Sequence, residues 1–349
     1  MKVTTRAYKA VCLKAELDES GAAAKSMQVR VNVISTDKGI VIVIGSSFKQ
    51  AHFIAYFQGA VFIENFSHGR ILPVVCYYKI SQAFRPYPMN YTVEDIPGNL
   101  CSHVNLAYFG LNETTWTIKP DSRKFDQLKT KFPRLKTLLS IGGWKNSRAQ
   151  VISFMASTMT RRRAFINHTV QTLLSNGFDG LDIFWMFRGE VHGDRNGTDK
   201  INFVRLLEEL YAAFKGHKLL LTATVPIDQH ILDAGYDIPA IDRYLDWMNV
   251  IGYGLRGYRN GRADIHSPLH PRTFDQPDVR QLNVEQGLQA LLDRGASRRK
   301  LVLGVAFFGL VYRLAVPENT TLHAPIDFFK WPENGAFLKS KTINAYFEV

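Results

Sequence analysis

The residues best suited to chemistry lie at positions 178–187, which read Phe-Asp-Gly-Leu-Asp-Ile-Phe-Trp-Met-Phe. Carboxylates at the end of a strand can act as general acids or bases, and this run holds Asp179 and Asp182. Side chains two apart share one face of a strand, so Asp182, Phe184 and Met186 are expected to point the same way. Methionine has no ionisable proton, and its sulfur is only a weak acceptor. We therefore expect both aspartates to accept structural hydrogen bonds while Phe184 and Met186 pack.

The elements that would position this run alternate regularly from residue 73 onward. Apolar, strand-like runs lie at 73–78, 103–110, 136–143, 178–185, 219–226, 246–254 and 301–309. Helical periodicity lies between several of them, at 161–176, 199–215 and 283–294, the first with Thr160 as its expected N-cap. Continuously apolar strands that alternate with helices indicate a parallel sheet. A TIM (β/α)₈ barrel, which takes ~250 residues, fits better than a doubly wound sheet, since no glycine-rich phosphate loop follows the first strand.

Composition excludes some classes of function. The chain has 349 residues, 46% of them hydrophobic, with 43 basic and 31 acidic side chains and a net charge of +12. Such a length fits one large domain with additions. The basic balance favours solubility and weak attraction to anionic surfaces. The sequence has neither a basic helix with interleaved aromatics nor zinc-finger spacing, so we expect no nucleic-acid partner, metal or cofactor.

Signals for the secretory route are mixed. The three cysteines, Cys12, Cys76 and Cys101, have no metal or redox spacing. The N-terminus leads into no apolar signal region. The apolar stretches 40–44 and 53–63 are shorter than the ~20 residues that span a bilayer, so no membrane partner is expected. Six Asn-x-Ser/Thr sequons favour secretion: Asn65, Asn90, Asn112, Asn167, Asn196 and Asn319.

The 178–187 run resembles the D-G-x-D-x-D-x-E signature of the family 18 glycoside hydrolases, the chitinases. Asp179, Gly180 and Asp182 match, whereas Phe184 replaces the third Asp and Met186 replaces the catalytic Glu. Further ordered runs resemble the family's first, second, third and sixth strands, the following helix start and the seventh strand. These runs are Val74–Tyr78, Cys101–Phe109, Leu138–Trp144, Trp247–Gly254, Gln281–Val284 and Lys300–Gly309.

The resemblance implies a barrel that is incomplete in this chain. Residues 71–314 would form the barrel, truncated before its eighth strand, and residues 315–349 resemble the start of an α+β insertion. Residues 1–70 are an extension of uncertain role. The first and seventh strands would then each lack a partner and expose apolar edges. Residues 40–44, which are β-branched, are the alternative: they could supply a surrogate eighth strand.

The resemblance also favours a Cys76–Cys101 disulfide between the first two strands, with two free buried thiols as the alternative. It further implies a sugar site at the mouth of the barrel. Aromatic residues that could stack on sugar rings, with barrel core as the alternative role, are Tyr78, Trp144, Trp185 and Tyr253, and less clearly Phe109 and Phe308.

Several residues of the family's sugar site are replaced in this chain. Tyr253 matches the tyrosine that contacts the N-acetyl group, but its neighbour Gly254 replaces an Asp. Ser81 stands where many members have a Trp, and Leu310 replaces an Arg. These changes argue against tight chitin binding as well as against hydrolysis.

We therefore expect an extracellular, catalytically inactive chitinase-like protein. Its partner would be chitin or another N-acetylglucosamine-containing glycan, bound weakly or in an altered way, with an anionic glycan as a further candidate. One alternative is an active chitinase in which Glu190, four residues after Met186, replaces the proton donor. A second alternative is a partial gene product without function.

Overall fold

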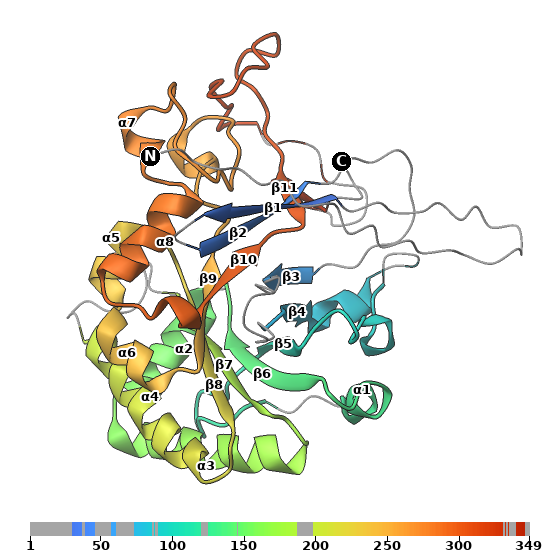
Figure 1. Cartoon of the computed structure of the whole chain (residues 1–349), viewed down its shortest axis with the longest axis vertical. Coiled ribbons are helices and arrows are strands. Elements are labelled where there is room, and N and C mark those ends of the chain that lie inside the picture. The colour runs from blue at the N-terminus through green and yellow to red at the C-terminus, as the bar shows by residue number, and fades with distance from the viewer. Residues whose placement is uncertain are drawn as a thin grey trace, which may run out of the picture.

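The chain is described by a computed structural model, which covers residues 30–36, 39–45, 57–60, 73–85, 87, 90–119, 125–144, 146–186, 198–330, 332, 334 and 340–345. Seven of the described strands follow one another in parallel around a barrel (Figure 1). They are β4 (Val75–Lys79), β5 (His103–Phe109), β6 (Lys136–Gly142), β7 (Gly180–Phe184), β8 (Leu220–Val225), β9 (Trp247–Ile251) and β10 (Leu301–Val305). This arrangement confirms the predicted TIM-type barrel that lacks its eighth parallel strand.

Helices lie on the outside of this barrel (Figure 1). They are α1 (Asp126–Lys131), α2 (Asn146–Ala156), α3 (Met159–Ser175), α4 (Asp199–Lys215), α5 (Gln229–Gly235), α6 (Ile238–Tyr244), α7 (Pro277–Arg280) and α8 (Val284–Asp293). The three predicted helices correspond to α3, α4 and α8. The predicted cap of α3 is wrong, because Thr158 rather than Thr160 accepts the hydrogen bond from the Arg161 N–H. None of the described helices has the length and apolar character needed to cross a membrane.

A short antiparallel strand closes the barrel where the eighth parallel strand is missing. This strand, β3 (Phe57–Ala60), pairs with β4 on one side and with β10 on the other. The expectation that the first and seventh strands lack partners is therefore wrong. The expected apolar edges are covered as well: Val75 is fully buried, and Val74, Leu303 and Val305 are half-buried.

The alternative, in which residues 40–44 supply a surrogate eighth strand, is also wrong. Those residues lie in β2 (Gly39–Gly45), which pairs antiparallel with β1 (Arg30–Thr36) in a separate two-stranded sheet. The two strands are only two residues apart in sequence, so pairing with each other costs less loop-closure entropy than pairing with a distant barrel strand.

The predicted seventh strand is also divided. Beyond β10, β11 (Phe308–Leu310) leaves the barrel and pairs antiparallel with β12 (Ile343–Ala345). The proposed division of the chain at residues 70 and 314 stays a prediction.

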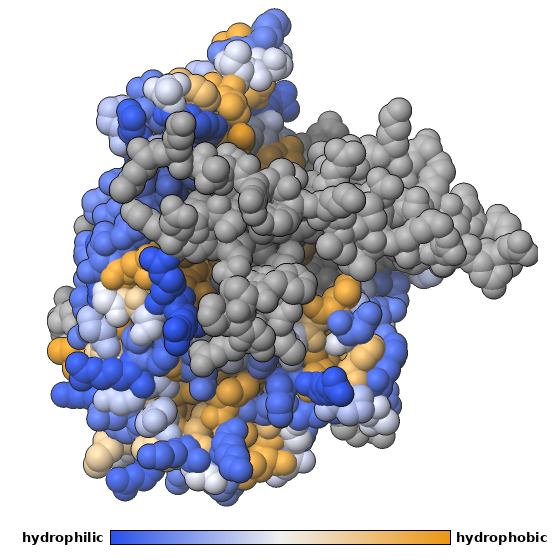
Figure 2. Space-filling model, viewed as in Figure 1, coloured by the Kyte–Doolittle hydropathy of each residue, from blue (hydrophilic) through white to orange (hydrophobic). Residues whose placement is uncertain are grey.

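Apolar side chains pack in layers because successive residues of a strand point to opposite sides of the sheet. The largest cluster fills the space between the strands and the helices, and includes Leu106, Ile183, Trp185 and Phe203. A smaller cluster inside the barrel includes Val75, Tyr77, Leu138 and Trp247. On the face shown in Figure 2, apolar side chains of the described residues lie in separate groups among hydrophilic ones.

The pairing of β3 leads to a prediction about truncated chains. Removing residues 1–60 deletes β3, whereas removing residues 1–56 keeps it. The longer deletion leaves β4 and β10 with unpaired backbone groups. We expect it to melt about 5 °C or more below the shorter deletion and to bind apolar dyes. Equal melting temperatures in differential scanning calorimetry would show that β3 contributes nothing to the closure of the barrel.

Candidate functional site

The interior of the barrel contains a buried carboxylate that is fully enclosed by hydrogen-bond donors. Asp182 on β7 has no exposed surface. Its Oδ2 accepts from Ser140 Oγ at 2.6 Å and Tyr77 OH at 3.0 Å. Its Oδ1 accepts from Thr222 Oγ1 at 2.8 Å and Asn249 Nδ2 at 3.0 Å. The donors come from β6, β4, β8 and β9, so this single side chain joins strands from much of the barrel.

The surroundings of Asp182 favour its protonated form. Burial raises the pKa of the carboxyl, and the four hydrogen bonds offset only part of that effect. The network extends further, because Tyr77 OH lies 2.9 Å from Thr224 Oγ1 and Trp247 Nε1 donates to Asn249 Oδ1 at 3.0 Å. Tyr77 and these polar strand residues were not among the predicted site residues. The sequence marks such residues as polar positions inside otherwise apolar buried strands, because a buried polar side chain must find a hydrogen-bond partner.

Asp179 lies apart from this interior network. Its carboxylate contacts Lys129 Nζ at 2.6 Å and Lys136 Nζ at 3.0 Å, and it accepts from the Thr137 N–H at 2.8 Å. Burial raises the pKa of Asp179, but the hydrogen bonds from Lys129, Thr137 and Lys136 outweigh it and lower the pKa. The residue therefore serves to tie β7 to β6 and α1.

The mouth of the barrel above Asp182 is apolar. Phe184 and Met186 are buried and pack with Ile251 and Tyr253, and half-buried Tyr108, Ala306 and Phe308 adjoin them. The Phe184 ring meets the rings of Tyr108 and Trp144 edge-on, with centroids 5.6 and 5.2 Å apart. Along the described part of β7, Asp182 is the one carboxylate on the inner face. Glu190 lies outside the described residues.

Two glycines place Trp144 at this mouth. Gly142 and Gly143 both adopt positive φ, at 91° and 96°. A Cβ on Gly142 would lie 2.1 Å from the carbonyl oxygen of Phe184, and one on Gly143 would lie 2.8 Å from the Tyr108 ring. The backbone can therefore pass close to β7, where the Gly143 N–H donates to the Phe184 carbonyl at 3.0 Å. Trp144 follows directly and is 36% exposed.

The predicted glycan-contacting residues do not all meet at the mouth. Trp144 and Tyr253 lie together there, with ring centroids 6.4 Å apart. Tyr78 and Trp185 instead belong to the layer between strands and helices, where both are almost completely buried. Tyr78 donates to the Tyr91 carbonyl, and Trp185 packs against Phe203. This placement contradicts a sugar-contacting role for Tyr78 and Trp185, because strand alternation points them away from the interior.

The structure also shows where the remaining residues singled out by the sequence analysis lie. The Cys76–Cys101 disulfide is present, with the Cα atoms 6.0 Å apart, which confirms the crosslink between β4 and the start of β5. Phe109 is buried in the outer layer, whereas Phe308 lies at the mouth beside Tyr253. Gly254 is exposed with φ 67°.

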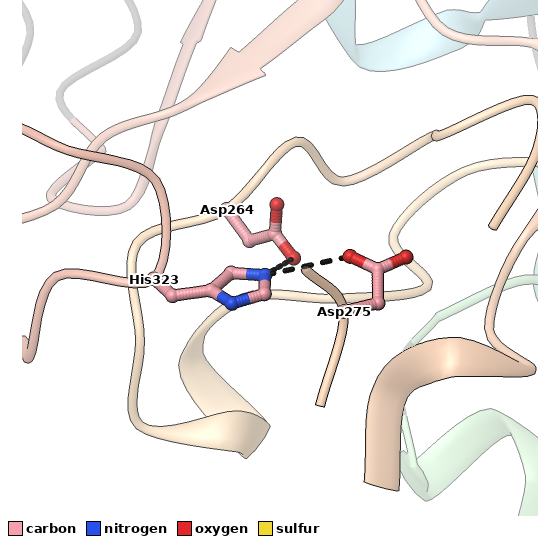
Figure 3. A group of neighbouring side chains, drawn as sticks. All are labelled: Asp264, Asp275 and His323. Atoms are coloured by element: carbon pink, nitrogen blue, oxygen red, sulfur yellow. Dashed lines mark ion pairs between the residues drawn. The ribbon is translucent and has the colours of Figure 1, made fainter. Parts of the chain in front are cut away.

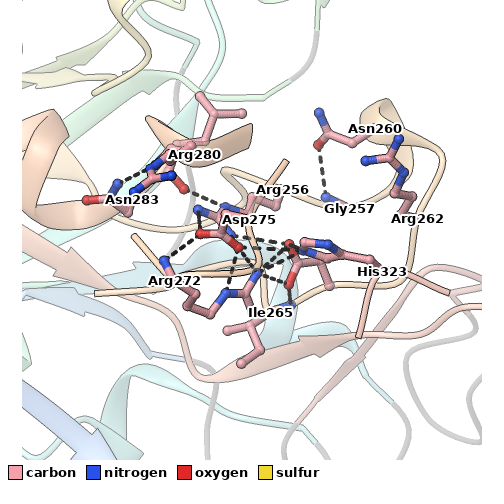
Figure 4. Close-up of polar contacts among 12 residues, drawn as sticks. Arg256, Gly257, Asn260, Arg262, Ile265, Arg272, Asp275, Arg280, Asn283 and His323 are labelled. Carbon is pink, nitrogen blue, oxygen red and sulfur yellow. Dashed lines mark hydrogen bonds and ion pairs between the residues drawn. The ribbon is translucent and has the colours of Figure 1, made fainter. Parts of the chain in front are cut away.

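A second polar cluster lies in the loops beyond β9. Asp264, Asp275 and His323 offer ligand atoms within 4.8 Å of one another, which is the spacing of a metal site (Figure 3). Two guanidinium groups already occupy this cluster (Figure 4). Arg256 binds Asp275 through two bonds of 2.9 Å, and Arg272 Nη2 lies 2.7 and 2.8 Å from the Asp264 oxygens.

The charges in this cluster balance without an ion. Burial opposes ionisation of Asp275, but the hydrogen bonds from Arg256 and Arg272 outweigh it and hold its pKa far below the ordinary value. A metal ion would have to displace both arginines, so the residues fit an ion-pair cluster better than a metal centre. The cluster joins residues 256–275 to the segment around His323.

Fold and site together define a β/α barrel whose mouth is lined by aromatic and other apolar side chains. The sequence pattern of the glycosyl hydrolases family 18 matches residues 73–348, and the chain belongs to this family. The endochitinase of Manduca sexta is 33% identical over 272 residues, 74% of this chain and 48% of its own length. Chitotriosidase-1 of Mus musculus is 32% identical over 294 residues, 80% of this chain and 62% of its own length. The chain thus spans about half to three-fifths of these relatives.

Solved structures show the same architecture. The Group IV chitinase of Ostrinia furnacalis superimposes with a TM-score of 0.74 and 28% identity, covering 79% of this chain and 76% of the chitinase. Human YKL-39, a pseudo-chitinase with retained chitooligosaccharide binding properties, superimposes with a TM-score of 0.70 and 27% identity, covering 78% and 76%. The solved structures with this fold therefore include both a chitinase and a pseudo-chitinase with retained chitooligosaccharide binding.

The enclosed state of Asp182 leads to a prediction about stability. Asp182→Ala leaves four buried donors without an acceptor, so we expect a loss of about 2–4 kcal/mol. Asp182→Asn keeps the shape and two polar atoms, and should lose less than half as much stability.

The folded pKa of Asp182 lies above the unfolded one, so its contribution to stability rises as pH falls between those values. Urea unfolding against pH should show this acid-side gain in the native chain but not in Asp182→Asn. If both proteins showed the same dependence of stability on pH, the raised pKa of Asp182 would be contradicted.

Proposed function

We propose that this protein is a catalytically inactive chitinase-like lectin that binds N-acetylglucosamine-containing glycans at the mouth of its barrel. The observation that carries the proposal is the packing of Phe184 and Met186, at the positions of the family's acids, into the apolar cluster of the mouth. Neither side chain can deliver a proton to a leaving oxygen. Loss of general-acid assistance alone removes about 10²–10⁴-fold in rate.

Glycan recognition then depends on the aromatic surface that remains. Trp144 is the most exposed of the mouth aromatics named above. Tyr253 lies beside it, and Phe308 lies beside Tyr253. Phe184 and Met186 occupy the depth of the mouth. A sugar chain would accordingly stack on Trp144 near the surface rather than enter the barrel, and its binding would be weak. The net charge of +12 makes an anionic glycan the second ligand to test.

The activity prediction uses an N-acetylglucosamine oligomer with a chromogenic leaving group. We expect no detectable turnover by the native chain. Met186→Glu alone should restore none, because Phe184 and Gly254 remain at the positions of two further family acids. Turnover that disappears in Glu190→Gln would instead establish an active hydrolase with a replacement acid.

The binding prediction concerns Trp144. Isothermal titration with chitopentaose should detect binding, and Trp144→Ala should weaken it roughly tenfold or more. Trp185→Phe is the matched control, because Trp185 lies in the outer layer and should leave the affinity unchanged. If the native chain binds neither chitopentaose nor an anionic glycan, the lectin proposal fails and the reading as a partial gene product gains.

We also propose that the protein is secreted and glycosylated. Among the described sequons, Asn90 and Asn167 are exposed, and Asn112 and Asn319 lie in turns in which their Oδ1 accepts from nearby backbone N–H groups. Glycans at these four positions would extend into solvent. Expression of the full-length gene in insect or mammalian cells should yield secreted protein whose peptides lose mass at these asparagines on enzymatic deglycosylation. Unmodified protein retained inside the cells would contradict the proposal.

A further inference from the structure

His266 lies between the two segments that carry the aromatic mouth. It belongs to the loop beyond β9, and its Nδ1 accepts from the Gly254 N–H at 3.1 Å. Its Nε2 lies 3.1 Å from the carbonyl oxygen of Phe308, the first residue of β11. The imidazole also stacks on the Phe308 ring, with centroids 5.1 Å apart and planes 12° from parallel. Phe308 is therefore held through both its backbone and its ring.

These contacts define the tautomer of His266. A backbone N–H can only donate, so Nδ1 must carry the lone pair that faces Gly254. The proton then lies on Nε2, where it is donated to the Phe308 carbonyl. Only the neutral Nε2–H form satisfies both partners, because an imidazolium would direct a second N–H at the Gly254 N–H.

Phe308 connects His266 to the proposed sugar surface. Its ring meets the Tyr253 ring at 5.9 Å, and Tyr253 in turn meets Trp144 at 6.4 Å. Gly254 lies beside Tyr253 and is exposed, with space around it where a Cβ would point.

We propose that His266 is a positioning residue, which in its neutral form holds Phe308, Tyr253 and Trp144 in the arrangement that binds glycan and releases them when it is protonated. This proposal rests on the proposed glycan-binding function for its affinity readout. His266 contacts no sugar itself and acts through Phe308.

The surroundings of His266 support this role. The segments that contact His266 carry several titratable or charged groups, among them Tyr253 beyond β9, Asp264 and Arg256 in the loop, and Tyr312 after β11. The carboxylate of Asp264 is directed to Arg256 and Arg272, and Tyr312 OH donates to the Asp264 carbonyl. Burial lowers the pKa of His266, and the hydrogen bond to Phe308 offsets part of that effect. The folded pKa thus lies below the unfolded one, so the neutral arrangement persists at neutral pH and is lost as pH falls through the folded value.

The experiment combines binding with a readout that needs no ligand. Chitopentaose affinity is measured from neutral pH down to about 4.5 for the native chain, His266→Phe and His266→Asn. His266→Phe keeps an aromatic ring against Phe308 but loses both ring hydrogen bonds. His266→Asn keeps an acceptor near Gly254 without the contact to Phe308. His270→Gln is the control, because His270 is exposed and pairs with Glu285. Imidazole ¹⁵N resonances report the tautomer, and the indole resonance of Trp144, assigned with Trp144→Phe, reports the mouth.

We expect native affinity to fall roughly tenfold on acidification, together with a shift of the Trp144 resonance and protonation of His266. His266→Phe should bind roughly three- to tenfold more weakly at neutral pH and show little further pH dependence. His266→Asn should recover part of the loss, and His270→Gln should behave as the native chain. An Nδ1–H tautomer, or a Trp144 resonance unchanged in His266→Phe, would overturn the positioning role. If the native chain binds no glycan but the tautomer and Trp144 shifts are as expected, the proposed function fails while the coupling of His266 to the mouth stands.

Discussion

The carboxylate of Asp182 is the constraint on which this barrel depends. Burying a carboxyl group in an apolar interior is costly, and here four donors from four different strands offset part of that cost. Each donor must lie at the correct height in the barrel for all four hydrogen bonds to Asp182 to form. The register of β4, β6, β8 and β9 around β7 is therefore specified by polar chemistry as well as by packing. The apolar mouth and the outer helices are arranged around this centre.

The edges of the barrel impose a second constraint, which concerns backbone pairing rather than side-chain chemistry. A barrel requires that each edge strand finds a partner, but it does not require that the partner be parallel or belong to the family pattern. A four-residue segment, β3, satisfies the backbone groups of β4 and β10 from the opposite direction. No motif marks such a segment, because backbone hydrogen bonds carry little sequence information. The more strand-like run at 40–44 pairs locally instead, since a neighbouring partner is available.

Much of the fold follows from the sequence because strand-like runs recur seven times, with helical periodicity between several of them. The site could be predicted in part. Alternation by two residues correctly groups Asp182, Phe184 and Met186 on one face, and the same rule places Ile183 and Trp185 on the other. Applied to β4, it selects Tyr77 rather than Tyr78 for the interior. His266 could not be found in this way, because its role arises from a loop that returns to Gly254 and Phe308 across long stretches of sequence.

The packing of Phe184 also bears on how readily an acidic side chain could occupy position 184. A carboxylate at position 184 would share a face with Asp182 two residues away, so ionising both would be opposed by their like charges. The same change would remove the ring that fills the space between Tyr108 and Trp144 and would leave a void. Replacing Phe184 with an acid therefore lowers stability before any acid pair exists to be selected. Once an aromatic side chain has filled such a mouth, its packing opposes an acid at that position, and later sequence divergence is directed toward other uses of the surface.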